Sequence, residues 1–207
     1  MKAILISIKP KYVAKILNGE KIIEIRKSFP KCDLPITVYI YCTKHNHYKD
    51  SLYEVCEEDG GGYDVDYYAP SEPDFILNGK VVAKFTLNKV EEIKCNLSMR
   101  FFTKSFNEKE LLEKSCLTVD ELFWYLAPQE LKAKCCGYAW HISDLQIFDK
   151  PKDLNDDEFH KIGFDKYYYS DHSHEGYLQW ANKVADLIVH KAPQSWMYCE
   201  VEFNEIH

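Results

Sequence analysis

Three ionisable side chains lie close together near the N-terminus, at Lys21, Glu24 and Arg26. If residues 21–27 form a strand, the alternation of side chains places Glu24 and Arg26 on one face. Lys21 follows a turn at Gly19, from where its long side chain can reach a space between the preceding helix and the strand. The two cations can bind phosphate, and the carboxylate can accept hydrogen bonds or act as an acid or base.

An alternative interpretation is that Glu24 and Arg26 form a solvated surface pair and Lys21 is an ordinary turn residue, because isolated surface ion pairs are common and weak. The charge distribution bears on this choice. The chain has a net charge of −7, but residues 1–31 contain seven lysines and Arg26 against Glu20 and Glu24, a local balance of +6. Such a region can attract an anionic ligand, or it can be a solvated helix face. The overall acidity argues against a protein that coats duplex nucleic acid through phosphate contacts alone.

The elements that would position these residues are a strand, a helix and a second strand. The helix begins at Pro10, which suits a first helical turn, and ends at Gly19, which suits a left-handed cap. Alternating or apolar runs predict strands over residues 3–8, 21–27, 36–42, 80–87, 137–147 and 195–203. Helical patterns cover residues 108–114, 118–126 and 176–192, and Thr118 with Glu121 forms a capping box. We expect the apolar cluster at 122–126 to lie in the core.

The fold class expected from this pattern is α+β, with a curved mixed sheet or small β-barrel of about six strands and flanking helices. The 207 residues suit one domain with an adequate core. Two stretches, at about 45–78 and 155–192, interrupt the pattern and are interpreted as insertions. The first contains Gly60–Gly62 and nine acidic residues, so it is a poor phosphate-binding arm.

Composition also bounds the location and the cofactors. No apolar stretch is long enough to span a bilayer or to serve as a signal peptide, so we expect a cytoplasmic protein that does not contact membranes. The eight cysteines are scattered, which favours reduced thiols. The spacing of Cys42, His45 and His47, or of His172 and His174, is poor for zinc. We therefore predict no metal and no cofactor.

The run Gly-x-Lys-x-x-Glu-x-Arg at residues 19–26 resembles the signature of the ASCH domain family, which belongs to the PUA-like superfamily. Other segments in the same order are similar to the opening, middle and closing strands of that family: Ile6–Pro10, Gly79–Phe85, Tyr138–Ile142 and Pro193–Trp196. These anchors span most of the chain. The resemblance implies a single PUA-like β-barrel domain over residues 1–207, of a bacterial or phage type with insertions.

The resemblance also implies a partner: RNA, a single-stranded nucleic acid or a modified nucleoside, bound in a basic cleft over the barrel. The candidate ligand-binding residues are Lys9, Lys21, Glu24, Arg26, Thr43 and His141. Lys9, Lys21 and Arg26 would hold phosphate, and Glu24 would accept a hydrogen bond from the amino group of a base. A lone histidine in a strand such as His141 is also compatible with a structural role.

The second function is a hydrolase acting in the same cleft. Some small ASCH proteins are amidohydrolases that deacylate N4-acetylcytidine, and others are ribonucleases. The catalytic lysine of the amidohydrolases matches Lys21, but Glu24 stands where they have a threonine, and their catalytic glutamate has no clear match here. Lys21 and Glu24 are therefore the candidate catalytic residues, Lys21 as base or nucleophile and Glu24 as acid or base. The oligomeric state is left open by the sequence.

Overall fold

The computed structural model describes residues 1–44, 77–96, 100–126, 137–154, 159–162, 185 and 187–201. The chain forms two compact units, and each is discontinuous in sequence. Unit 1 comprises Met1–Pro10, Thr37–Lys84 and Ile147–His207, and unit 2 comprises Lys11–Ile36 and Phe85–Gln146. In the part of the chain described, no helix is long and apolar enough to cross a membrane.

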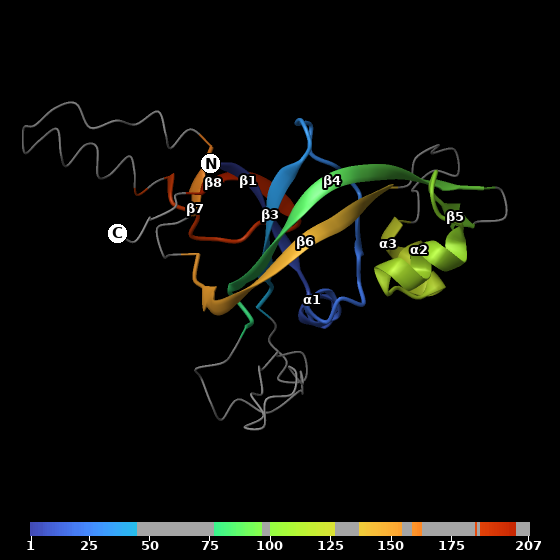
Figure 1. The fold of residues 1–207 in the computed structure, drawn as a ribbon, viewed down its shortest axis with the longest axis horizontal. Coiled ribbons are helices and arrows are strands. Elements are labelled where there is room, and N and C mark those ends of the chain that lie inside the picture. The colour runs from blue at the N-terminus through green and yellow to red at the C-terminus, as the bar shows by residue number, and fades with distance from the viewer. Residues whose placement is uncertain are drawn as a thin grey trace, which may run out of the picture. The chain divides into compact units, whose positions relative to one another are not determined.

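Unit 1 is built on a mixed sheet in which the neighbouring strands run in the order β4-β3-β1-β8-β7 (Figure 1). The strands are β1 (Lys2–Ile8), β3 (Ile36–Cys42), β4 (Val81–Cys95, of which the first residues belong here), β7 (Phe159–Lys161) and β8 (Trp196–Val201). Strand β1 pairs in parallel with β3 and antiparallel with β8. Residues 3–8 of β1 are all buried, as expected of a central strand covered on both faces.

The core of unit 1 lies against β1, β3 and β8. Its buried members include Leu5, Tyr39, Phe159, Val189 and Val201. The helix predicted over 176–192 does not reach its expected end, because Ile188 forms an antiparallel bridge with His160. Val189 instead donates its backbone N–H to the carbonyl of Phe159 at 2.9 Å. Most of that predicted helix lies outside the described residues, as do residues 45–76 of the first predicted insertion.

Unit 2 combines strands with three short helices, of which α2 and α3 are drawn next to each other in Figure 1. Helix α1 (Pro10–Leu17) precedes β2 (Ile23–Arg26), and α2 (Glu108–Ser115) is followed by α3 (Val119–Leu126). The strand order is β2-β6-β4, where β6 is Gly137–Lys152, and the short β5 (Phe101–Phe102) pairs with β4. The core includes Ile23, Ile25, Phe101, Leu111 and Leu122.

The predicted α+β class with a mixed sheet is confirmed. Within each unit, the described strands form an open sheet and not a closed barrel. Eight strands are present among the described residues, compared with about six expected. The two further strands, β5 and β7, have two and three residues, too short to produce a visible alternation in the sequence. The single-domain organisation over 1–207 stays a prediction.

The predicted ends of the helices are confirmed by their hydrogen bonds. Gly19 has φ +74° and donates its N–H to the carbonyl of Ile16 at 2.9 Å, so it forms the left-handed end of α1. At the start of α3, the Glu121 N–H donates to Thr118 Oγ1 at 3.1 Å. The Thr118 N–H donates back to Glu121 Oε2 at 2.9 Å, which completes the capping box.

One packing prediction for α3 is wrong in part. Leu122 and Leu126 are buried, but Trp124 is 77% exposed and Tyr125 is 38% exposed. Consecutive side chains of a helix point in different directions, and α3 buries only one face of its eight residues. A run of five apolar residues on this helix therefore cannot be buried completely.

Glu121 also connects α3 to α1. Its Oε1 accepts hydrogen bonds from Lys11 Nζ at 2.6 Å and from Tyr12 Oη at 3.1 Å. The Lys11 hydrogen bond and the backbone hydrogen bond of Thr118 lower the pKa of Glu121 from 4.5 to about 2. One carboxylate therefore caps α3 and holds α1 against it.

We expect this contact to be sensitive to acid. Because the pKa of Glu121 is lower in the folded state, its contribution to stability is present above about pH 4.5 and is lost as the pH falls towards 2. Lys11→Met removes the largest cause, so the carboxyl titration followed by NMR should move back towards 4.5. Lys15→Met is the matched control, because Lys15 is an exposed lysine of the same helix paired at 3.8 Å with Glu20. An unchanged Glu121 midpoint in Lys11→Met would contradict this assignment.

Candidate functional site

Lys21 enters the candidate site from the turn between α1 and β2. Its N–H donates to the carbonyl of Lys15 at 2.9 Å, which follows from the left-handed cap at Gly19. Strand β2 begins only at Ile23, so strand alternation does not fix the direction of Lys21. The side chain is turned inward and is 2% exposed.

The Lys21 ammonium contacts three groups in unit 2. Nζ donates a hydrogen bond of 2.6 Å to the carbonyl of Ser115, the last residue of α2. It lies 3.2 Å from Glu24 Oε2 and 5.4 Å from the centre of the Tyr12 ring. The helix terminus, the carboxylate and the aromatic face all favour a positive charge at this point.

Arg26 lies on the other side of the same carboxylate. Its Nε is 3.0 Å from Glu24 Oε1, so Glu24 is shared between two cations. Burial raises the pKa of Tyr125 on α3, and the charge and hydrogen bond of Arg26 oppose this increase. Tyr125 is also contacted by Lys27, whose Nζ lies 5.4 Å from its ring centre. We call Lys21, Glu24 and Arg26 the buried triad.

The burial of the triad rules out the interpretation of an exposed surface pair. Lys21, Glu24 and Arg26 are 2%, 6% and 7% exposed. A buried charge is costly unless it is paired and hydrogen-bonded, and here two cations share the Glu24 carboxylate. Lys21 Nζ also donates a hydrogen bond to the Ser115 carbonyl. The catalytic role of Lys21 as base or nucleophile stays a prediction.

His141, also a predicted ligand-binding residue, does not lie among the side chains of the buried triad, and its role in binding stays a prediction. In the register of β2 and β6, Ile23 pairs with His141, and Glu24 pairs with Trp140. Directly opposed residues share a face and successive residues alternate, so His141 and Glu24 lie on opposite faces of this strand pair. His141 therefore belongs to a second polar cluster.

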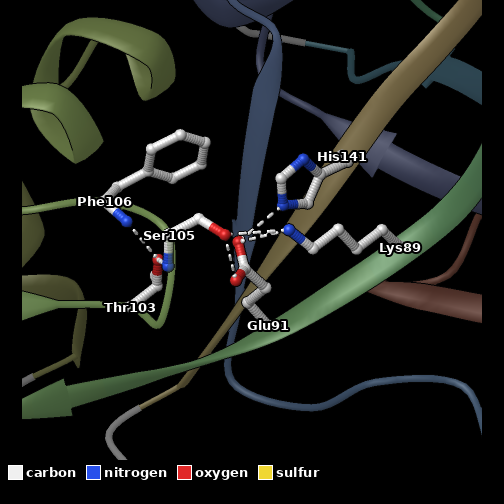
Figure 2. A network of polar contacts seen from close by, with 6 residues as sticks. All are labelled: Lys89, Glu91, Thr103, Ser105, Phe106 and His141. Atoms are coloured by element: carbon white, nitrogen blue, oxygen red, sulfur yellow. Dashed lines mark hydrogen bonds and ion pairs between the residues drawn. The ribbon is translucent and has the colours of Figure 1, made fainter.

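This second cluster is centred on Glu91 of β4 (Figure 2). Glu91 Oε1 accepts a hydrogen bond from Ser105 Oγ at 2.8 Å, and Oε2 lies 2.9 Å from His141 Nε2 and 3.3 Å from Lys89 Nζ. Lys89 Nζ also donates to Ser105 Oγ at 2.9 Å. Burial raises the pKa of Glu91, but the hydrogen bonds from Ser105, His141 and Lys89 together lower it below its usual value.

The Glu91 cluster fastens the segment before α2 to the sheet. The Phe106 ring stacks on His141 with 5.7 Å between the ring centres, and its backbone N–H donates to Thr103 Oγ1 at 3.0 Å (Figure 2). Asn107, the next residue, caps α2. The cluster therefore sets the start of the helix whose last carbonyl receives Lys21.

Lys9 and Thr43, the two other predicted ligand-binding residues, belong to unit 1. They follow the ends of the parallel strands β1 and β3, where the Thr43 N–H donates to the Ile8 carbonyl at 2.9 Å. Lys9 is exposed, and Thr43 is half-buried. The structure brings these two residues together at one end of the strand pair. Their participation in ligand binding stays a prediction.

Several residues of the site were missed by sequence reasoning. Tyr12 had a recognisable place on α1, five residues before the end of the helix, but nothing in the pattern showed that it faces Lys21. Ser115 contributes only a backbone carbonyl, which has no side-chain signal. Tyr125 was assigned to the core, and Glu91 occurs in a strand that was predicted to end at residue 87.

The described residues contain no group of three or more His, Cys, Asp or Glu side chains that could hold a metal ion. His45, His47, His172 and His174, which were considered as zinc ligands, lie outside the described residues. Cys42 is a buried free thiol, and burial raises its pKa to about 12.

Comparisons with known proteins give similarity at the level of structure. No family model matches the chain, and no curated protein sequence matches it. A crystal structure of ASCH from Zymomonas mobilis is similar with a TM-score of 0.48 and 14% identity, covering 98% of this chain and 89% of the other. A tyrosine-to-phenylalanine mutant of the same protein has a TM-score of 0.48 and 15% identity over 96% and 90% of the two chains. A serine-to-alanine mutant has a TM-score of 0.48 and 14% identity over 95% and 87%.

Removing the shared carboxylate should strongly destabilise unit 2. Glu24→Gln removes the charge that pairs with both buried cations, Lys21 and Arg26, and we expect a loss of about 3–5 kcal/mol in the free energy of unfolding. Urea denaturation followed by circular dichroism measures this change. The matched control is Glu20→Gln, which removes an exposed partner of Lys15 and should cost less than about 1 kcal/mol. Equal losses in the two variants would show that the triad is not a stabilising centre.

Proposed function

We propose that this chain is an ASCH-domain protein that binds RNA, a single-stranded nucleic acid or a modified nucleotide at the buried triad. The observation that carries the proposal is the placement of two cationic side chains, Lys21 and Arg26, around the Glu24 carboxylate. A phosphate group can accept hydrogen bonds from such cations, and Glu24 can accept a hydrogen bond from a base. Lys9 and Thr43 of unit 1, and His141 on the opposite face of β2 and β6, stay candidate ligand-binding residues from the sequence and are not part of the triad.

The positions of the family-like segments support this proposal. The Gly-x-Lys-x-x-Glu-x-Arg run begins two residues after the end of α1 and includes all of β2, as expected if the motif builds a site. The similar segment Tyr138–Ile142 lies within β6, directly beside β2 in the sheet. The motif and its neighbouring strand are therefore adjacent in space, although more than a hundred residues separate them in sequence.

The second candidate is a hydrolase that uses Lys21 and Glu24, in which N4-acetylcytidine and water give cytidine and acetate. The observation that favours it is the burial of Lys21 within 3.2 Å of a carboxylate. Buried ionisable pairs of this kind are frequent in active sites. In the geometry described here, the Lys21 ammonium would polarise the amide carbonyl, and Glu24 would take a proton from the attacking water.

The proposed location is the cytoplasm. Five cysteines in the described residues are free thiols: Cys32, Cys42, Cys95, Cys116 and Cys199. Free thiols of this number are typical of proteins from a reducing compartment.

Two measurements test the binding function and the hydrolase separately. We expect a fluorescein-labelled single-stranded RNA of 12 nucleotides to bind the wild-type protein with an affinity that decreases as salt increases. Arg26→Lys keeps the charge beside Glu24 but removes the planar fork, so it should weaken binding by roughly 3- to 30-fold. Fluorescence anisotropy measures the affinity, and Lys15→Met is a control lysine of α1 outside the triad.

The hydrolase is tested by a mass-spectrometric time course of N4-acetylcytidine, free and within the same RNA. Turnover by the wild type that is lost in Lys21→Ala, with its fold verified by circular dichroism, would establish an enzyme at the triad. Intact substrate together with RNA binding would support the binding function. Absence of both turnover and RNA binding would overturn both candidates.

A further inference from the structure

The largest exposed aromatic side chain among the described residues lies on α3, next to the buried triad. Trp124 is 77% exposed, although large apolar side chains elsewhere in unit 2 are mostly covered. Its ring contacts that of Phe123 edge to face, with 5.6 Å between the ring centres. The Phe123 contact supports one edge of the indole, and most of the surface of Trp124 stays open to solvent.

Trp124 is connected to the triad through its neighbour in the sequence. Tyr125 is hydrogen-bonded to Arg26, and its ring is contacted by the Lys27 ammonium at 5.4 Å. Lys27 is itself exposed. The buried Arg26 is therefore followed outward by Tyr125 and by the exposed Lys27 ammonium over its ring, and Trp124 is the exposed neighbour of Tyr125 on α3.

A second pair of aromatic rings borders Arg26 on β6. Arg26 pairs with Tyr138 in the sheet register, and the Tyr138 ring packs on Phe29 with 4.6 Å between the ring centres. Phe29 is 38% exposed. The cationic end of the triad is therefore surrounded by partly exposed aromatic rings, and the next exposed lysine, Lys31, is two residues farther along the chain.

We propose that Trp124 is a stacking platform for an unpaired base of a single-stranded nucleic acid, and that Lys27 binds the adjoining phosphate. This inference rests on the proposed nucleic-acid binding at the triad. It describes where the next nucleotides of the bound nucleic acid would lie. Aromatic faces bind bases of any sequence, and alternation of aromatic rings with cations is the usual surface of single-strand binding sites. In a duplex the bases are stacked on each other, so the platform selects unpaired strands.

Charge favours a nucleic acid over an apolar protein surface as the occupant. Lys27 and Lys31 are exposed beside the aromatic rings, and of the two carboxylates on α3, Glu121 is paired with Lys11 while Asp120 is exposed. A hydrophobic protein partner would have to desolvate these lysines without providing counter-charges. The phosphates of a strand provide them at regular intervals.

The experiment compares Trp124→Ala with the wild type in anisotropy titrations with a fluorescein-labelled single-stranded RNA of 12 nucleotides. We expect Trp124→Ala to weaken binding by about 5- to 100-fold, and Trp124→Phe to retain affinity within about threefold, since a ring is still present. Lys27→Gln should reduce the slope of log affinity against log salt by about 0.7, the value for one phosphate contact on a single strand. Val119→Ala, which changes another exposed apolar residue of the same helix, is the control expected to leave affinity unchanged.

A strand of abasic DNA distinguishes stacking from charge. It keeps the phosphates and lacks the bases, so Trp124→Ala and the wild type should bind it equally. Wild-type binding of the RNA with no loss in Trp124→Ala would overturn the platform and leave the proposed function standing. If Trp124→Ala instead abolished self-association in sedimentation while RNA affinity was unchanged, α3 would be a protein interface. Failure of the wild type to bind any single strand would overturn the proposed function itself.

Discussion

Unit 2 depends on one interaction in particular: the Glu24 carboxylate pairs with both Lys21 and Arg26. Each cation is almost fully buried and would be costly without this partner. The need to satisfy Lys21 explains why the C-terminus of α2 is brought to the start of β2, since the Ser115 carbonyl provides a second acceptor. The need to place Arg26 explains the contact of β2 with Tyr125 of α3.

The two polar clusters of unit 2 lie on opposite faces of β2 and β6 and differ in their interactions. On one face, two cations of the buried triad share one carboxylate. On the other face, Glu91 accepts a hydrogen bond from Ser105 and contacts His141 and Lys89. The first cluster is therefore the better candidate for binding, and the second is better explained as support for α2.

Much of the backbone was predictable because its signals are local. Proline and glycine at the two ends of α1, the capping box of α3 and the alternation in β3 each depend on residues within one turn or strand. The triad was also predictable as a set, because Glu24 and Arg26 are two residues apart. The partners at Ser115, Tyr125 and Glu91 were not, since each depends on packing between segments that are distant in sequence. The face on which His141 lies was not predictable either, because alternation within one strand does not show which residues of the neighbouring strand lie opposite it.

The double role of Glu121 has a consequence for local unfolding. The same carboxylate accepts from Lys11 of α1 and caps the first turn of α3, so breaking either contact weakens the other. The two helices are then coupled as one cooperative opening unit, although no covalent loop joins them directly. Amide hydrogens in the first turn of α3 would exchange in step with those of α1, and the aromatic surface of α3 would be presented only while α1 is docked.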